Sequence, residues 1–240
     1  MRYYVSSDWH GDVNAFRLCE SELPDTPTTV LLLGDIGLTY GDFNNVYLKE
    51  LMSKSPHTYI VMRGNHDKRY VKYAKEQEDG WGWEQGTWGD NEIWYQKKYP
   101  NILYVKDEGG LYHIGGMNCL FIPGAWSIDG MYRQAHGLPW EYDEELSLIE
   151  QYKIVKLVNE NRIDYVFSHD CPYRWQEELK EFFLPIKVKP QIGFNLFLNN
   201  VLGDLKNLDK WYFGHYHGNK IVGEGKGELI YQSPIFFKEI

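Results

Sequence analysis

Five short apolar segments of this chain are each followed, within a few residues, by aspartate, asparagine or histidine. The segments are Arg2–Val5, Thr29–Leu33, Thr58–Met62, Asp164–Phe167 and Lys210–Phe213. Short runs rich in β-branched and aromatic residues predict strands that are buried on both faces, as in a parallel sheet. Because parallel strands end at one edge of a sheet, the polar residues that follow them can converge on one crevice there.

Helical patterns alternate with these strands and with further strands. The additional strands are expected at Leu111–Ile114, Cys119–Ile122 and Glu228–Tyr231, and a long helix over about residues 141–161. Apolar residues at Phe197, Val201, Leu202 and Leu205 predict another helix. This alternation predicts an α/β protein with much parallel sheet. With 240 residues, 43% of them hydrophobic, we expect a single domain over residues 1–240.

Residues 68–100 depart from this alternation. The segment contains Trp81, Trp83, Trp88 and Trp94, interleaved with glycines. We interpret it as an excursion from the scaffold, whose tryptophans pack on the protein because large aromatic side chains are mostly buried. The alternative is that exposed tryptophans stack on a nucleobase. A second irregular loop is expected from Gly124 to Trp140.

Charge and cysteine content restrict the partners and the location. The formal net charge of −9 argues against a general electrostatic grip on nucleic acid, although it leaves room for a metal-lined cleft. The chain has an odd number of cysteines, Cys19, Cys119 and Cys171, and no CxxC pair. This favours a reducing, cytoplasmic setting. The first residues are too polar for a signal peptide, and no apolar run approaches membrane-spanning length, so no membrane contact is expected.

The polar residues behind the five strands are carboxylates, amides and imidazoles. They are Asp8, His10, Asp35, Asn65, His66, Asp67, His169, His215 and His217. Mixed oxygen and nitrogen donors without a thiolate suit Mn, Fe, Zn, Co or Ni better than Ca. The set is too large for one tetrahedral ion, whereas two ions about 3.5–4 Å apart can share one carboxylate. We therefore expect two divalent metal ions, with Mn²⁺ as the first choice and Fe, Zn, Co and Ni as alternatives.

Each of these residues also has an ordinary structural interpretation. His10 or His169, taken alone, is typical of a hydrogen-bonded histidine, and Asp8 of a helix cap. Gly34-Asp35 alone is a common turn signal. The string Gly64-Asn65-His66-Asp67 rarely occurs by chance, and its combination with the other strand ends favours a metal site.

In this order, the strand-end residues resemble the signature of the calcineurin-like metallophosphoesterases. The matching residues are Asp8-x-His10, Gly34-Asp35, Gly64-Asn65-His66-Asp67, His169 and Gly214-His215-x-His217. The resemblance spans residues 8–217. It implies a four-layer α/β/β/α sandwich with two mixed β-sheets flanked by helices, and a metal-dependent phosphoric ester hydrolase with a dinuclear metal centre at the strand ends.

The resemblance also implies a role for each residue. Asp8, His10 and His217 correspond to ligands of a first metal, and Asn65, His169 and His215 to ligands of a second. Asp35 corresponds to the ligand that bridges the two ions. His66 corresponds to the general acid, with Asp67 orienting its ring. The resulting hypothesis is in-line attack by a metal-bridging hydroxide while His66 protonates the leaving oxygen.

Two departures from the patterns of known subfamilies narrow the range of expected substrates. The segment after Gly34-Asp35 lacks the arginine that marks the protein Ser/Thr phosphatases of this superfamily, and Leu38 stands where purple acid phosphatases have a metal-binding tyrosine. Both types are therefore disfavoured. The first hypothesis is a phosphodiesterase acting on a nucleotide or a nucleic-acid end. The alternatives are a phosphomonoesterase and, third, a non-catalytic scaffold of the same fold.

The loop from Gly124 to Trp140 supplies the candidates for substrate binding. Arg133 could reach the substrate phosphate bidentately, or it could be a surface arginine paired with Asp129 or Glu141. His136 is a second candidate from the same loop. The expected partner is thus a phosphate-ester substrate. The sequence does not determine the oligomeric state.

Overall fold

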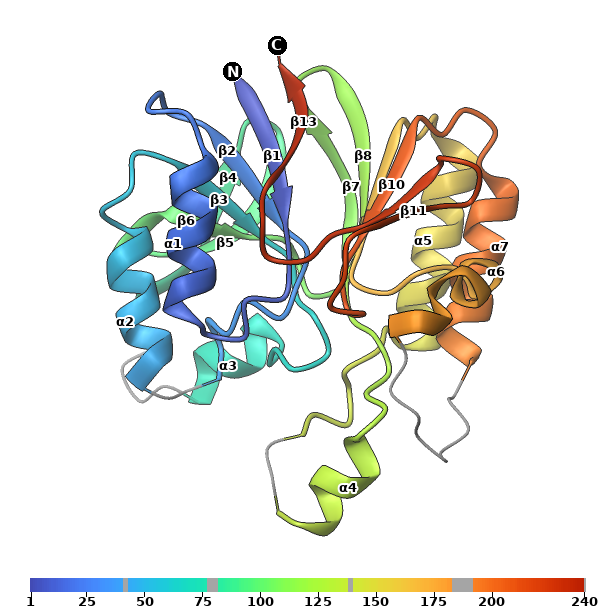
Figure 1. Cartoon of the computed structure of the whole chain (residues 1–240), viewed down its shortest axis with the longest axis horizontal. Coiled ribbons are helices and arrows are strands. Elements are labelled where there is room, and N and C mark those ends of the chain that lie inside the picture. The colour runs from blue at the N-terminus through green and yellow to red at the C-terminus, as the bar shows by residue number, and fades with distance from the viewer. Residues whose placement is uncertain (41–42, 77–81, 138–139, 183–191, 240) are drawn as a thin grey trace.

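Two β-sheets packed face to face form the centre of the protein, and helices cover the outer face of each sheet (Figure 1). The computed structural model describes residues 1–40, 43–76, 82–137, 140–182 and 192–239. The prediction of an α/β/β/α sandwich with two mixed sheets flanked by helices is confirmed.

The first sheet has seven strands in the order β13-β1-β2-β3-β6-β5-β4. Its parallel centre consists of β1 (Arg2–Ser6), β2 (Thr29–Leu32), β3 (Thr58–Val61) and β6 (Tyr99–Tyr104). The antiparallel strands at its two sides are β13 (Ile235–Glu239), β5 (Asn91–Gln96) and β4 (Trp83–Trp88).

The second sheet has six strands in the order β11-β12-β10-β9-β8-β7. Its parallel centre consists of β12 (Gly227–Leu229), β10 (Lys210–Phe213), β9 (Tyr165–Ser168) and β8 (Met117–Ile122). The antiparallel edges are β11 (Lys220–Val222) and β7 (Gly110–Ile114).

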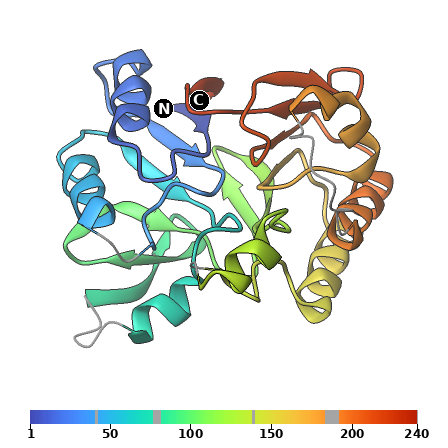
Figure 2. The ribbon, with the colours of Figure 1, turned by 60° about the horizontal axis from the view of Figure 1, so that its bottom comes forward.

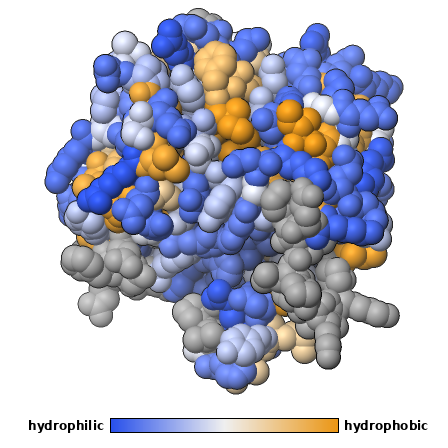
Figure 3. Space-filling view, viewed as in Figure 1, coloured by the Kyte–Doolittle hydropathy of each residue, from blue (hydrophilic) through white to orange (hydrophobic). Residues whose placement is uncertain are grey.

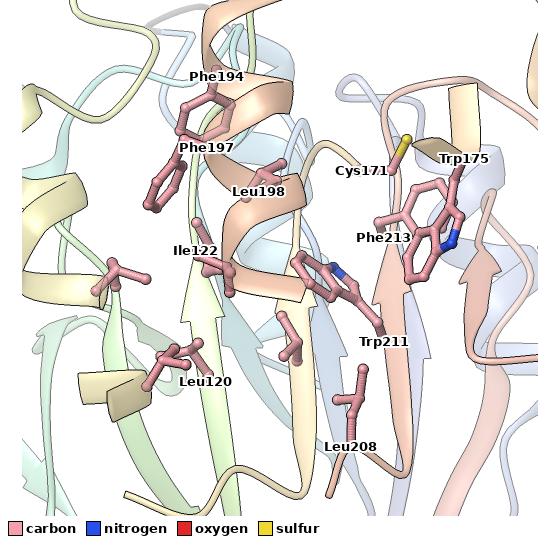
Figure 4. Packing of buried hydrophobic residues seen from close by; sticks show 14 of the residues in the cluster. Leu120, Ile122, Cys171, Trp175, Phe194, Phe197, Leu198, Leu208, Trp211 and Phe213 are labelled. Carbon is pink, nitrogen blue, oxygen red and sulfur yellow. The ribbon is translucent and has the colours of Figure 1, made fainter. Parts of the chain in front are cut away.

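Alternate residues of β2 and β10 enter different cores, which explains why the buried part of each strand is apolar on both faces. In β2, Val30 and Leu32 pack toward the outer helices, whereas Leu31 enters the core between the sheets. In β10, Trp211 faces the helices of the second sheet and Tyr212 faces the first sheet. Figure 4 shows Trp211 packed beneath the helix that carries Leu198.

The outer helices divide between the two sheets. The helices are α1 (Val13–Glu22), α2 (Phe43–Met52) and α3 (Tyr70–Glu76) on the first sheet, and α5 (Leu148–Glu160), α6 (Tyr173–Gln176) and α7 (Gly193–Asp204) on the second, with a 3₁₀ helix at Glu177–Phe182. The helix expected over about 141–161 begins later, at Leu148. Ser147 and Glu150 form a capping box there, so the chain before Ser147 is not helical.

The segment 68–100 differs from the expected excursion. β4 and β5 form a hairpin that extends the first sheet, and β6 pairs with β3. Trp83 packs against Tyr70, Tyr73 and Tyr104. The tryptophans of this hairpin therefore contribute to packing, as expected, while Trp81 lies outside the described residues, which omit 77–81.

The carboxyl ends of the parallel strands meet at one edge of both sheets, at the bottom of Figure 1 and turned toward the viewer in Figure 2. Helix α4 (Gly130–Ala135), from the Gly124–Trp140 loop, projects from this edge. The surface there is largely hydrophilic, unlike the apolar patches higher on the same face (Figure 3). Among the described residues, no helix combines the length and apolar character needed to cross a membrane.

Candidate metal centre

The chain turns sharply after β1, β2 and β10, and it does so at the expected ligands themselves. Asp8, His10, Asp35, His215 and His217 all have left-handed backbone, with φ between 48° and 73°. Residues with a Cβ are uncommon in this region because of steric crowding. The turns direct five side chains back across the edge of the sheets, where they meet.

Glycines allow the strand-end loops to touch. A Cβ at Gly64 would lie 2.1 Å from Asp35 Oδ1 and 2.6 Å from the Asp35 backbone nitrogen. A Cβ at Gly214 would lie 2.1 Å from Ser7 Oγ and 2.4 Å from Asp8 Oδ2. The glycine that precedes Asn65 and the one that precedes His215 are therefore needed for close approach of one loop to a carboxylate on another.

We expect Gly64→Ala to weaken metal binding strongly and to destabilise the fold by about 1–3 kcal/mol, because the added methyl group must displace Asp35. Calorimetric titration with Mn²⁺ and thermal unfolding would measure both effects. Gly203→Ala, in α7 where a Cβ meets nothing within 4 Å, is the matched control. Wild-type Mn²⁺ affinity in Gly64→Ala would contradict the prediction.

One group of donors consists of Asp8, His10 and His217. The Nε2 atoms of the two histidines lie 2.9 Å apart, and they lie 3.9 Å and 3.7 Å from Asp8 Oδ1. Asp8 is fully buried, and its Oδ1 has no hydrogen-bond partner among the described residues, while Oδ2 accepts from the His215 backbone N–H. An unpartnered buried carboxylate oxygen facing two imidazole nitrogens fits a divalent cation.

A second group consists of Asn65, His169 and His215. Asn65 Oδ1 lies 2.9 Å from His169 Nε2 and 3.1 Å from His215 Nδ1. His169 Nδ1 donates to the Leu33 carbonyl at 2.7 Å, which directs Nε2 toward the site. Burial keeps the pKa of His215 well below its usual value, so its ring is neutral and able to ligate.

Asp35 lies between the two groups. Its Oδ2 is 3.4 Å from His169 Nε2, and ligand atoms of Asp8, Asp35 and His169 all lie within 4.8 Å of one another. Burial alone would lower the pKa of His169, but the Asp35 carboxylate raises it to about 10. This carboxylate thus favours positive charge at the His169 ring, and a divalent cation bound there would displace the proton. The structure thus brings together all seven expected ligands, and their oxygen and nitrogen donors fit two divalent ions.

His66 and Asp67 differ in how they fit the expected roles. The His66 ring lies at the rim of the site, with Nε2 3.9 Å from Asp35 Oδ2. Among the described residues, Asp67 makes no hydrogen bond that would orient this ring. Its Oδ2 accepts from the backbone N–H groups of Asp35 and Gly64, and its Oδ1 accepts from Thr39 Oγ1. Asp67 therefore fixes the backbone that carries Asp35.

The two substrate-binding candidates lie on or next to α4. Arg133 donates its Nε to Asp129 Oδ2 at 2.6 Å, which is one of the two pairings weighed from the sequence. His136 caps the helix end, where Nδ1 bonds to the Tyr132 carbonyl and the ring lies over the Tyr132 ring. The structure thus gives both residues local partners.

Four residues that the sequence did not single out contact the expected ligands or their partners. The Tyr40 hydroxyl lies 3.2 Å from His10 Nδ1, and the Tyr231 ring stacks on His217. Ser127 bonds to Asn65, and Glu144 bonds to Ser127. No sequence motif marks these residues, because each is separated along the chain from the side chain that it contacts. Tyr40, which comes shortly after Gly34-Asp35, is the one with a local sequence signal.

The carboxyl group of Glu145 has its pKa raised to about 7 by burial and by Glu144 and Asp170. The folded state therefore holds a proton that the unfolded state has lost, so stability falls as pH rises from about 4.5 to about 7. Glu145→Gln removes this penalty. Because solvent screens the partly exposed group, we expect a gain of about 1 kcal/mol at pH 8, or about 2–4 °C.

Thermal unfolding of Glu145→Gln and wild-type protein at pH 4.5 and pH 8 tests this expectation. The melting temperatures should differ at pH 8 and approach one another at pH 4.5. An equal difference at both pH values would show that the carboxyl group of Glu145 does not titrate as described.

Comparison with known proteins agrees with this geometry. A sequence model described as calcineurin-like phosphoesterase matches residues 1–219 of the chain. No curated protein matches significantly.

Solved structures provide the remaining similarity. The phosphopantetheinyl hydrolase PptH from Mycobacterium tuberculosis aligns with a TM-score of 0.50 and 13% sequence identity, over 96% of this chain and 88% of that one. A second solved structure aligns with a TM-score of 0.50 and 14% identity, over 95% of this chain and 89% of that one. At such identities these similarities concern the fold.

Proposed function

Because this chain belongs to the calcineurin-like phosphoesterase family, and is thereby a metal-dependent phosphoric ester hydrolase, we propose that it cleaves phosphodiesters of a nucleotide or nucleic-acid type. The observation that carries the proposal is the position of Asp35 between two groups of metal donors, with the His66 ring beside it. Fold similarity to PptH, at 13% identity, does not decide the substrate of this chain.

In this proposal Asp8, His10 and His217 would hold one divalent ion, Asn65, His169 and His215 would hold the other, and Asp35 would be the ligand available to both. When bound, such ions lower the pKa of water and neutralise charge on the phosphoryl group. We propose Mn²⁺ as the working metal, with Fe, Zn, Co and Ni as alternatives, because the donors are nitrogen and oxygen without a thiolate.

The protein's own groups act around that centre. His66 projects from the Gly64–Asp67 loop with its side chain 23% exposed, so it can meet a substrate and still lie next to Asp35. In this proposal His66 holds a proton for the leaving oxygen, a role worth about 10²–10⁴-fold in rate. Asp67 holds the loop rigid through the backbone of Asp35 and Gly64.

The preference for a diester rests on the sequence, because the segment after Gly34-Asp35 lacks the arginine that marks the protein Ser/Thr phosphatases of this superfamily. Arg133 donates its Nε to Asp129 Oδ2, and its positive charge also acts on Tyr40, whose hydroxyl lies 3.2 Å from His10 Nδ1.

The proposal is tested by comparing hydrolysis of bis(p-nitrophenyl) phosphate and p-nitrophenyl phosphate by the Mn²⁺-loaded protein, with Asp35→Asn as the blank. Faster cleavage of the diester is the expected result. Faster cleavage of the monoester would overturn it in favour of a phosphomonoesterase. Cleavage of neither ester above the blank, with two Mn²⁺ bound, would favour the non-catalytic scaffold.

A further inference from the structure

The side-chain amide of Asn65 has one end that can bind a cation and one that cannot. Its Oδ1 carries lone pairs and lies 2.9 Å and 3.1 Å from the ligating nitrogens of His169 and His215. Its Nδ2 carries two N–H groups and has no lone pair to offer. If the amide were inverted, a donor would face the cation and the ligand would be lost. Something must therefore fix the direction of this amide.

Ser127 fixes that direction at the Nδ2 end. The Asn65 Nδ2 donates to Ser127 Oγ at 2.7 Å, and Ser127 Oγ in turn donates to Glu144 Oε2 at 2.6 Å. A hydroxyl group has a single proton, so an oxygen that donates to Glu144 can only accept from Asn65. Only the Nδ2 end of the amide satisfies that requirement. Both Asn65 and Ser127 are buried, which makes a mismatch costly.

Burial raises the pKa of Glu144, but the hydrogen bonds that it accepts from Ser127 and Trp140 favour the ionised form. Glu144 is the origin of this polarity because an ionised carboxylate only accepts. Its two oxygens receive three donors: the Ser127 backbone N–H at 2.8 Å, the Ser127 hydroxyl at 2.6 Å and the Trp140 Nε1–H at 3.0 Å. The Glu144 backbone carbonyl accepts from buried Arg63 at 2.6 Å, next to the Gly64–Asp67 loop. The carboxylate is thus fixed in place relative to Asn65.

We propose that Ser127 and Glu144 are positioning residues that orient the Asn65 amide so that Oδ1 faces the second metal. The inference deepens the proposed function and rests on it. Ser127 follows β8 and Glu144 precedes α5, so both come from the half of the molecule that carries the second sheet. Asn65 follows β3 of the first sheet. The hydrogen-bond chain therefore aligns a ligand from one half of the molecule with polar groups from the other.

The first test is Glu144→Gln, measured by calorimetric titration of the metal-free protein with Mn²⁺. Whichever way the new amide turns, one of its N–H groups meets another donor, either Ser127 N–H or Trp140 Nε1–H. We expect the second equivalent of Mn²⁺ to bind about 10–100-fold more weakly, with the first equivalent unchanged. The matched control is Glu145→Gln. In the part of the chain that the structure describes, Glu145 Oε1 has no hydrogen-bond partner, so this variant should bind both equivalents as wild type does.

A second variant background, Asn65→Asp, distinguishes a loss of amide orientation from general damage to the metal site. In Asn65→Asp both side-chain oxygens can ligate, so no direction needs to be fixed. There, two carboxylates compete for the one proton of Ser127, and Glu144→Gln relieves that competition by supplying a donor. We therefore expect Glu144→Gln to weaken the second site in the wild-type background and to leave it unchanged or strengthen it in the Asn65→Asp background.

The outcomes separate this inference from the function on which it rests. Equal weakening in both backgrounds, or wild-type binding in Glu144→Gln, would overturn the positioning role while leaving the two-metal site intact. If the wild-type protein itself bound fewer than two Mn²⁺, the proposed function would fail first. Circular dichroism and thermal unfolding of each metal-free variant verify that the fold is retained.

Discussion

Asp35→Asn is expected to lose both metal ions and all hydrolysis above background. The substitution keeps the size of the side chain and can keep the acceptor for His66 N–H, yet it removes the one negative charge shared by both groups of donors. Its new N–H₂ group would face His169, where a donor opposes the bound cation. Losing a shared ligand should exceed the about 10–100-fold loss in affinity that follows removal of a ligand's supporting partner.

Metal content after dialysis and calorimetric titration with Mn²⁺ measure this effect. Asp107→Asn is the matched control, because Asp107 is also a buried carboxylate but accepts from the backbone of Tyr70 and Val71 instead of facing the site. Two tightly bound equivalents of Mn²⁺ in Asp35→Asn would be incompatible with a bridging role for this residue.

His66→Ala should keep both metal ions and lose about 10²–10³-fold in turnover of esters with poor leaving groups. The ring lies at the rim of the site, where it touches the His10 ring edge-on but, among the described residues, makes no hydrogen bond to a ligand, so its removal should leave the donors in place. The backbone N–H of residue 66 still donates to Asp35 Oδ1 in the variant. Esters of p-nitrophenol need little help from an acid, so their hydrolysis should fall much less.

The measurement is kcat for a p-nitrophenyl diester and for an alkyl diester, with Mn²⁺ binding determined in parallel. His113→Ala is a suitable control, because His113 lies on β7 with its ring bonded to Asn118, away from the strand ends that form the site. If His66→Ala lost equal activity on both esters, proton donation to the leaving group would not be the role of His66.

The parts of the fold that sequence predicts well are those in which one physical requirement dominates. β1, β2, β3, β9 and β10 are covered on both faces, so their apolar runs are continuous and their ends are marked by polar residues. The hairpin of β4 and β5 lies at the edge of its sheet and is partly exposed, so polar and aromatic residues alternate there with glycine. That composition resembles a loop, which is why the hairpin was not predicted.

The same distinction applies to the candidate site. All seven expected ligands converge because each lies within a few residues of the end of a strand, and strand ends can be recognised in the sequence. The partners of Asp67 were not predictable, because they are backbone N–H groups of Gly64 and Asp35 that meet only through close contact of two loops. Ser127 and Glu144 likewise reach Asn65 through tertiary contacts between the two halves of the molecule.

The left-handed backbone at five of the ligands also bears on how long the protein survives in a cell. If each such residue costs about 1 kcal/mol, the five together cost about 5 kcal/mol, which equals the lower end of the total stability of natural domains. Bound cations stabilise only the folded chain, so they offset this cost through mass action. We therefore expect a molecule that has not acquired its ions to unfold more often and to be degraded sooner, which would couple the lifetime of the protein to the supply of metal.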